Sequence, residues 1–128
     1  MFQGRIRAVA GVGTRGYTAA VRILYIQKDP FVNMGVTSLA AWCNELGHES
    51  HLLIENAERD LKRSVRRIDP DVVAFSVTTG LHLWAIACGA AIKRWFPQIK
   101  TVYGGMHATF YPEMVEGSAV DVVCRGDG

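Results

Sequence analysis

Short apolar runs alternate with helix-like segments from residue 21 to residue 124, and this alternation constrains the fold more than any other feature. The apolar runs are rich in β-branched and aromatic residues, which predicts buried strands. The predicted strands are residues 21–27, 49–54, 72–77, 101–103 and 120–124. Because a helical segment separates each strand from the next, the strands are expected to be parallel with right-handed crossovers. The sequence therefore predicts an α/β fold: a doubly wound five-stranded parallel sheet of the flavodoxin-like or Rossmann-like kind.

Apolar residues at helical spacing predict the helices between these strands. The expected helices are residues 36–46, 61–68, 83–96 and 109–116. Gly47, Pro70 and Pro97 follow the first three helices and are typical stop signals. The second helix is expected to present a basic face to solvent, made of Lys62, Arg63, Arg66 and Arg67. The third is expected to turn Leu83, Ala87, Ala90 and Ala91 toward the sheet.

Composition and charge exclude several classes of function. The chain has 128 residues, 49% of them hydrophobic, which is enough for one domain with a real core. A net charge of +2 is too small to indicate a nucleic-acid partner or an anionic membrane. No apolar stretch approaches the roughly 20 residues of a membrane span, and the first residues carry no secretory pattern. We therefore expect a cytoplasmic protein with neither a nucleic-acid partner nor a membrane span.

The cysteines and histidines form no motif for metal binding or catalysis. The cysteines are widely spaced without a CxxC pair, so they are predicted to be core residues in a reducing compartment. They are Cys43, Cys88 and Cys124. His48 and His51 flank the second strand and are expected to be surface residues, whereas His82 is expected at the rim of a ligand edge. No GxSxG motif exists, and no acid is placed to orient a catalytic histidine.

Residues 1–20 are predicted to be an N-terminal extension, and residues 21–128 the folded domain. Residues 11–16 fit the GxGxxG pattern of dinucleotide sites, but only residues 17–20 separate them from the first strand. That spacing leaves no room for the helix that a dinucleotide site requires. The last residues, 125–128, follow a strand without a helix to cover it, so the chain is expected to be an N-terminal domain excised from a longer protein.

Two neighbouring strand ends are expected to form a ligand edge. Ser76 and the residues up to Thr79 end the third strand with small hydroxyl groups, and Gly104 and Gly105 end the fourth. Paired glycines remove the side chains that would keep a flat ligand away from the backbone. Parallel strands place both features at the carboxyl edge, where open α/β sheets bind ligands. His107 follows directly, and it either contacts a ligand or bonds to the chain itself.

Four ordered segments carry a resemblance to a known family. They are Asp71-Val-Val-Ala-Phe-Ser-Val-Thr78, Tyr103-Gly-Gly-Met-His-Ala-Thr109, Pro112-Glu113 and Val120-Asp-Val-Val-Cys-Arg-Gly-Asp-Gly128. On these residues the chain resembles the cobalamin-binding domain that precedes the catalytic domain in cobalamin-dependent radical S-adenosylmethionine enzymes. The resemblance covers residues 21–128. It implies that the domain presents cobalamin to a downstream domain for methyl transfer, C-alkylation or ring formation.

The downstream domain of such enzymes holds S-adenosylmethionine and an iron–sulfur cluster. This chain lacks the CxxxCxxC motif of that cluster, so alone it is not expected to turn over a substrate. The classical cobalamin fold carries DxHxxG after the first strand, and its His is the lower axial ligand of cobalt. Here Asp29 is present but no His follows, and Gly35 is one residue too distant. The resemblance therefore implies a cobalamin site without a protein histidine on cobalt, and no residue is predicted to be a metal ligand.

The resemblance also implies which residues bind the cofactor. The loop after the first strand would lie beneath the corrin ring, the hydroxyl groups after the third strand would bond the tail or amide groups, and the paired glycines would let the ring approach the backbone. The predicted set is Asp29, Phe31, Val32, Asn33, Met34, Gly35, Ser76, Val77, Thr78, Thr79, Tyr103, Gly104, Gly105, Met106, His107, Ala108 and Gly126.

The main alternative is a cofactor-free docking or regulatory domain of the same fold, which the missing axial His leaves open. A phospho-receiver is a poorer alternative because the third strand ends in Ser-Val-Thr-Thr and not in an acceptor Asp. A flavodoxin is poorer still, because residues 28–35 lack a Ser/Thr-rich phosphate cradle. A classical mutase subunit would need the His that this loop lacks.

Overall fold

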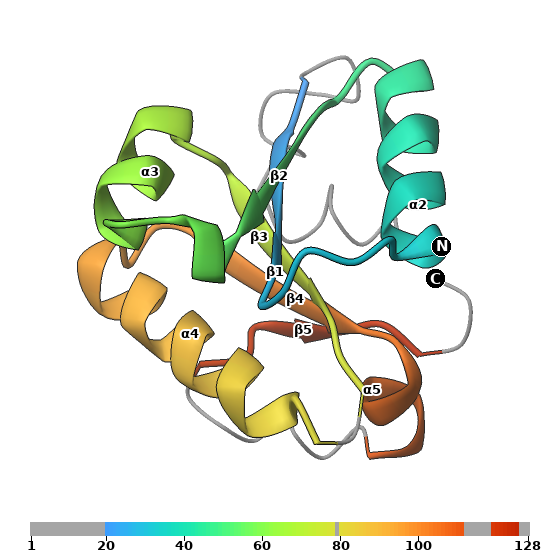
Figure 1. Ribbon diagram of the computed structural model, residues 1–128. Coiled ribbons are helices and arrows are strands. Elements are labelled where there is room, and N and C mark those ends of the chain that lie inside the picture. Colours follow the sequence, from blue (N-terminus) through green and yellow to red (C-terminus); the bar gives the residue numbers. More distant parts are fainter. Residues whose placement is uncertain (1–19, 79, 112–118, 126–128) are drawn as a thin grey trace.

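The computed structural model describes residues 20–78, 80–111 and 119–125 and contains a five-stranded sheet (Figure 1). The strands are β1 Arg22–Gln27, β2 Glu49–Ile54, β3 Val72–Ser76, β4 Lys100–Gly104 and β5 Val122–Val123. Their order in the sheet is β2-β1-β3-β4-β5, and every neighbouring pair is parallel. This order is the flavodoxin-like one, so the predicted doubly wound α/β fold is confirmed.

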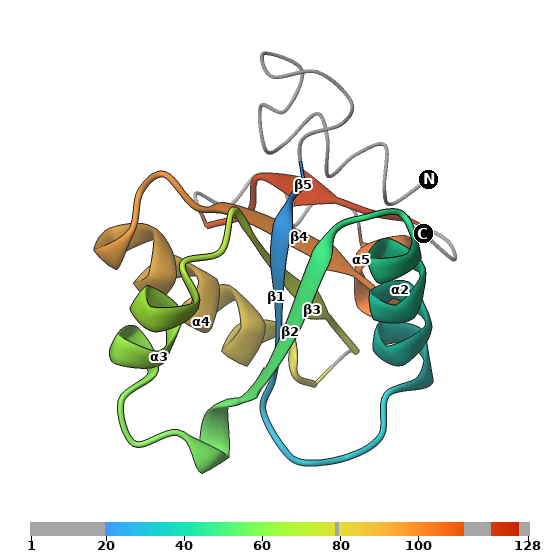
Figure 2. The same cartoon turned by 90° about the horizontal axis from the view of Figure 1, so that it is seen from above.

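The helices are α2 Met34–Glu45, α3 Leu61–Ile68, α4 His82–Trp95 and α5 Met106–Phe110, with a 3-10 turn, η2 Glu55–Ala57, after β2. Helix α2 covers one face of the sheet, and α3 and α4 cover the other (Figures 1 and 2). The side chains of Asn33 and Asp60 cap α2 and α3 by accepting from the backbone N–H groups of Val36 and Arg63. None of the helices in the described ranges is long and apolar enough to span a bilayer.

Two apolar layers, one on each side of the sheet, form the core. The layer under α3 and α4 includes Val65, Phe75 and Ile92, and the layer under α2 includes Ile23 and Val36. The prediction that the cysteines are core residues is confirmed, because all of them are buried: Cys43, Cys88 and Cys124. The basic face predicted for α3 is also confirmed, since Lys62, Arg63, Arg66 and Arg67 are exposed.

The predicted inward face of the third helix is wrong at Leu83 and Ala87, whereas Ala90 and Ala91 are partly buried. Leu83 and Ala87 are exposed, and the residues that face the sheet are Ala85, Cys88, Gly89 and Ile92. Small residues occur on every side of this helix, so its apolar pattern did not distinguish one face from another. The last predicted helix also begins earlier than expected, since α5 starts at Met106. The rest of that predicted helix, residues 112–116, lies outside the described residues.

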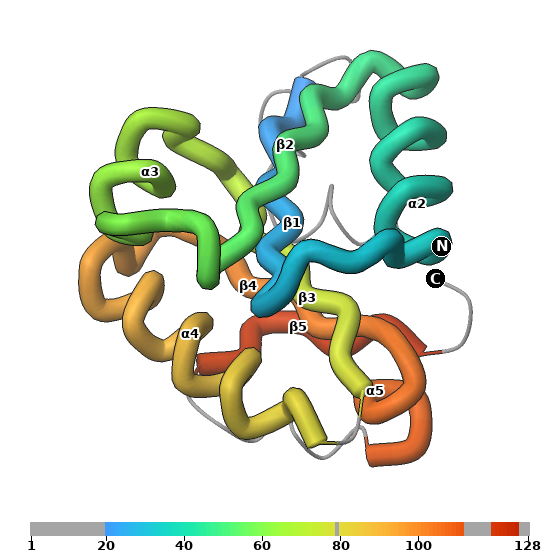
Figure 3. The backbone as a smooth tube through the Cα atoms, viewed as in Figure 1, coloured from blue at the N-terminus to red at the C-terminus, as the bar shows by residue number. Residues whose placement is uncertain are grey.

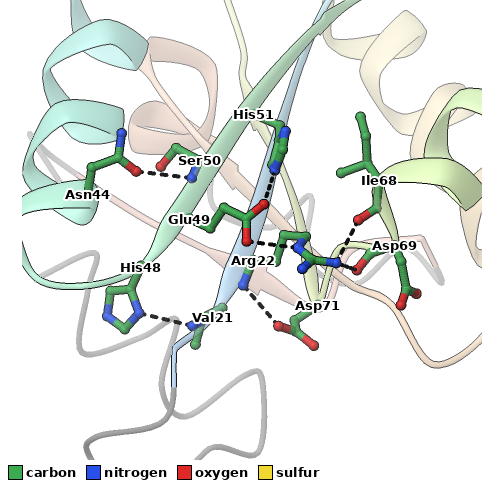
Figure 4. A network of polar contacts seen from close by, with 10 residues as sticks. All are labelled: Val21, Arg22, Asn44, His48, Glu49, Ser50, His51, Ile68, Asp69 and Asp71. Atoms are coloured by element: carbon green, nitrogen blue, oxygen red, sulfur yellow. Dashed lines mark hydrogen bonds and ion pairs between the residues drawn. The ribbon is translucent and has the colours of Figure 1, made fainter.

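Polar side chains join the amino-terminal ends of β1 and β2 to the end of α3 (Figure 4). Arg22 Nε donates to the carboxylate of Glu49 at 3.1 Å, and its Nη1 donates to the carbonyl of Ile68 at 3.0 Å. The Arg22 backbone N–H donates to the carboxylate of Asp71 at 2.9 Å. Hydrogen bonds from His51 and Arg22 hold the pKa of Glu49 below its ordinary value. This edge of the sheet is therefore occupied by bonds within the chain.

His48 contradicts the prediction that it is a surface residue. Its side chain is buried, and its Nδ1 accepts a hydrogen bond from the backbone N–H of Val21 at 3.1 Å (Figure 4). The physical reason is that the N–H at the start of β1 is itself buried and needs an acceptor. His51 is half-exposed and pairs with Glu49.

Candidate functional site

The carboxyl ends of β1 and β3 lie side by side where the sheet order reverses. Strand β1 leads through α2 to β2 on one side, and β3 leads through α4 to β4 on the other. Open α/β sheets bind ligands in the crevice outside such a switch point. The smooth tube in Figure 3 shows the loop after β1 running to α2 on one side of this point, and the end of β3 approaching α5 on the other.

The loop between β1 and α2 is held from its inner side. Gln27 is buried at the end of β1, and its Nε2 donates to the carbonyl of Phe31 at 3.0 Å. The backbone N–H of Asn56 donates to the carbonyl of Lys28 at 3.2 Å, and its side chain donates to the carboxylate of Asp29. These bonds hold the loop at its start and at Phe31.

The same loop presents apolar side chains to solvent. Val32 is 80% exposed and Met34 is 71% exposed, and Phe31 is about half-exposed. The side chain of Asn33, by contrast, is engaged as the cap of α2. Gly35 follows in the first turn of the helix. The loop thus offers an apolar surface at the switch point, while Asn33 fixes where the helix begins.

Backbone hydrogen bonds join the end of β3 to the turn after β4. The N–H of Val77 donates to the carbonyl of Gly104 at 2.8 Å, and its carbonyl accepts from the N–H of His107 at 3.0 Å. The side chain of Val77 is buried, whereas Ser76 and Thr78 are exposed. The two strand ends predicted to form a ligand edge are therefore adjacent, with the exposed residues Ser76 and Thr78 beside them.

Gly105 is required by this junction itself. Its φ is +93° and its ψ is −170°, a conformation that is essentially confined to glycine. A Cβ there would lie 2.8 Å from the carbonyl oxygen of Val77 and 2.9 Å from its nitrogen. At Gly104 a Cβ would lie 3.7 Å from the Cβ of Cys124 and 3.9 Å from its carbonyl oxygen, which are ordinary contacts. The paired glycines were expected to let a ligand approach the backbone. At Gly105 it is instead the end of β3 that approaches the turn.

His107 lies in a stack of three rings. It is 9% exposed, and its ring stacks on that of His82, with centroids 4.2 Å apart and planes at 12°. It also stacks with Tyr111 at 4.9 Å. His82 was expected only at the rim, and its pairing with His107 has no signature in the sequence, because it depends on how the starts of α4 and α5 meet. The stack brings two histidines from separate strand ends together.

Three members of the predicted set contribute to the core, and Val77, described above, is one of them. Tyr103 is fully buried, its hydroxyl donates to the carbonyl of Ala85 at 3.2 Å, and its ring stacks on Phe75. Ala108 is also fully buried. Their side chains therefore support the edge from inside. Thr79 and Gly126, the remaining predicted residues, lie outside the described residues.

Exposed apolar side chains gather around the strand ends. Large exposed apolar residues follow each of the three central strands, whereas Leu46 and Leu52 are exposed elsewhere. We call this set the apolar edge; it comprises Phe31, Val32, Met34, Leu83, Met106, Phe110 and Tyr111. Exposed apolar patches of this kind mark ligand or interaction surfaces. In the described part of the chain, no cluster of three or more His, Cys, Asp or Glu side chains could hold a metal ion.

The fold and this edge define the class: a doubly wound α/β domain with an apolar ligand edge at its switch point. Residues 28–128 match the B12 binding domain family, and the chain belongs to that family. A protein of Pyrococcus horikoshii named as an uncharacterized methyltransferase is similar to it, with 30% identity over 101 residues. The match covers 74% of this chain but only 22% of that relative.

The edge fits a corrinoid. Apolar side chains suit the faces of the ring, and Ser76 and Thr78, which are exposed residues with a hydroxyl group, suit its amide groups. The loop after β1 contains no histidine, so nothing in it corresponds to the classical lower axial ligand. Sequence reasoning missed Gln27, Leu83, Phe110 and Tyr111. A polar residue closing a buried strand was the available signal for Gln27; the other three required knowledge of which positions in and beside the helices face solvent.

Proposed function

We propose that this chain binds cobalamin at the apolar edge, without a protein histidine on cobalt, and presents it to a catalytic domain elsewhere in a longer protein. The apolar edge is the observation that carries the proposal, and membership of the B12-binding family supports it. When bound, cobalamin would supply an alkyl group on cobalt or another cobalt-borne function. The chain's own part is to bind and orient the ring and to keep water from its covered face.

The residues have distinct proposed roles. Phe31, Val32 and Met34 would cover apolar parts of the ring, because they are exposed and their loop is fixed by Gln27. Ser76 and Thr78 would bond polar groups of the cofactor. The whole predicted set, with Thr79 and Gly126, remains part of this proposal.

The reaction and the partner domain are part of the same proposal. We infer that the catalytic domain is a radical S-adenosylmethionine domain with an iron–sulfur cluster, which uses the corrinoid for methyl transfer, C-alkylation or ring formation. The name of the Pyrococcus horikoshii relative supports a methyltransferase setting. The cysteines, all of which lie in the described ranges, are buried and form no disulfide, and this supports a reducing, cytosolic location. Residues 21–128 are the proposed extent of the domain.

A spectroscopic titration with hydroxocobalamin tests the binding. We expect saturable binding by the wild-type chain, and at least tenfold weaker binding by Val32→Glu, which places a charge against an apolar ligand face. The matched control is Leu52→Glu, since Leu52 is exposed on β2 outside the apolar edge. A folded wild-type chain that binds no corrinoid, or equal effects of the two variants, would overturn the proposal and favour a docking or regulatory domain.

A further inference from the structure

His82 combines a fixed ring plane with a position beside the apolar edge. It is the first residue of α4, directly before the exposed Leu83. Its ring is partly exposed and stacks on the buried ring of His107, 4.2 Å away between centroids. His107 is in turn packed against Tyr111 and tied by its backbone to Val77. One face of the His82 ring is therefore held by a side chain that the core holds in place.

A backbone hydrogen bond determines which nitrogen of His82 carries the proton. Nδ1 accepts from the N–H of Gly80 at 3.2 Å, so Nδ1 must be unprotonated. The neutral ring then carries its hydrogen on Nε2. Gly80 has φ +104°, a conformation favoured by glycine, and this turn aims its N–H at the ring. The result is a donor of defined direction at the start of α4.

We propose that His82 is a ligand-binding residue whose Nε2–H donates to a side-chain amide carbonyl of the corrinoid, and that His107 is the positioning residue that holds its ring. The proposal rests on the proposed function. Corrinoids carry neutral amide groups around the ring, and an amide carbonyl is the acceptor that a neutral imidazole N–H matches. A donor that is already oriented loses little conformational entropy on binding, so it contributes more to affinity than a mobile side chain does.

Two substitutions separate the donor from the stacking. His82→Phe keeps a flat ring against His107 but removes the N–H, and His82→Gln keeps an N–H donor near the same place but removes the ring. We expect hydroxocobalamin to bind His82→Phe about tenfold more weakly than wild type and His82→Gln within about threefold of wild type. The control is His51→Phe, on β2 within the polar network at the opposite end of the sheet, which should bind like wild type.

The outcomes distinguish this inference from the function on which it rests. If the wild-type chain binds and His82→Phe binds equally well, the role of His82 is wrong and the corrinoid site stands. Loss of affinity in His82→Gln as large as in His82→Phe would also overturn the donor role. If the folded wild-type chain does not bind, the proposed function itself is wrong.

Nuclear magnetic resonance of protein labelled with 15N-histidine gives a readout that does not depend on affinity. In the free chain we expect the His82 ring to show an unprotonated Nδ1 and a protonated Nε2. Hydroxocobalamin should shift the Nε2 signal of His82 and leave the ring signals of His51 unchanged. In His107→Ala the single tautomer should give way to an average of both. A free chain with His82 protonated on Nδ1 would contradict the geometry, and an unshifted Nε2 signal in the bound chain would contradict the contact.

Discussion

At the scale of single residues, Gly105 and Gly104 are adjacent in the sequence but differ in what the backbone requires of them. Gly105→Ala should lower the free energy of unfolding by about 1–3 kcal/mol, because its φ of +93° disfavours any side chain and because a Cβ would press on the Val77 backbone. Gly104→Ala should change it by less than about 1 kcal/mol, since its Cβ meets only ordinary contacts. Urea unfolding of the two variants measures the difference.

Equal stability of the two glycine variants would contradict this assignment. Corrinoid affinity provides a second comparison. Contacts within the chain already require a glycine at position 105, but they do not require one at 104, where the glycine is predicted to make room for a ligand. A bulky residue at Gly104 that leaves the fold intact is expected to weaken hydroxocobalamin binding. Unchanged affinity in such a variant would remove Gly104 from the proposed site.

At the scale of elements, Gly89 determines how closely α4 approaches β4. A Cβ at this position would lie 1.8 Å from the hydroxyl oxygen of Tyr103. Gly89→Ala should therefore cost about 1–3 kcal/mol of stability through overpacking. Tyr103→Phe alone should cost about 1 kcal/mol, because the hydroxyl loses its bond to the carbonyl of Ala85. Both single variants are measured by urea unfolding.

The double variant tests the reason for these costs. Removal of the Tyr103 hydroxyl gives the new methyl group room, so Gly89→Ala with Tyr103→Phe should be less destabilised than the sum of the single variants, by about 1 kcal/mol. Additive costs would show that the clash with the hydroxyl is not what limits the approach of α4.

Asp121 attaches β5 to the rest of the sheet. Its carboxylate accepts from Lys93 Nζ at 2.7 Å and from the backbone N–H of Thr101 at 2.9 Å. Partial burial raises the pKa of Asp121, but the bonds from Lys93 and Thr101 outweigh it, and the pKa lies below its ordinary value. The stabilisation from these bonds is therefore fully present at pH values above the unfolded-state pKa of Asp121. It is lost as the pH falls through the lowered folded-state pKa.

Asp121→Asn should reduce the free energy of unfolding at neutral pH by about 1.5–3 kcal/mol. The difference between wild type and this variant should stay constant near neutrality and shrink once the pH falls below about 4, where the wild-type carboxylate loses its charge. Urea unfolding at a series of pH values measures it. A difference that grows with acidity would show that the sign of this argument is wrong.

The strands could be predicted from the sequence more completely than the helix faces, for a physical reason. A buried parallel strand is apolar on both sides, so residues 23–26 and 72–75 stand out as continuous apolar runs. In α4 the small residues Ala85, Ala87, Gly89 and Ala90 give no contrast between faces, and the orientation depends on packing against Tyr103. The start of α5 at Met106 likewise depends on the bonds between Val77 and the turn after β4.

At the scale of the whole molecule, the two ends of the sheet differ in kind. At the amino-terminal end, Arg22, Glu49 and Asp71 satisfy one another and the backbone (Figure 4). At the carboxyl end, the apolar edge remains exposed around the switch point. The sequence predicted the location of this edge, because parallel strands must place Ser76 and Gly104 together. The stacking of His82 on His107 could not be predicted, because it arises only when the segments that follow β3 and β4 meet.

This difference between the two ends of the sheet leads to a prediction for the apolar edge as a whole. If the ligand covers the apolar edge, hydroxocobalamin should reduce hydroxyl-radical labelling of Met34 and Met106, which are 71% and 61% exposed and follow different strands. Leu46 and Leu52 are exposed elsewhere and serve as internal controls, since the scavenging of radicals by the cofactor would lower all four signals alike. Mass spectrometry of peptides from samples labelled with and without hydroxocobalamin measures the ratio of the two labelling yields at each residue. Protection of Met34 and Met106 beyond that of the two leucines is the expected result, because a ring that bridges the loop after β1 and the turn after β4 must cover both. Protection of only one of them would confine the ligand to one side of the switch point, and uniform loss of labelling would contradict binding at this edge.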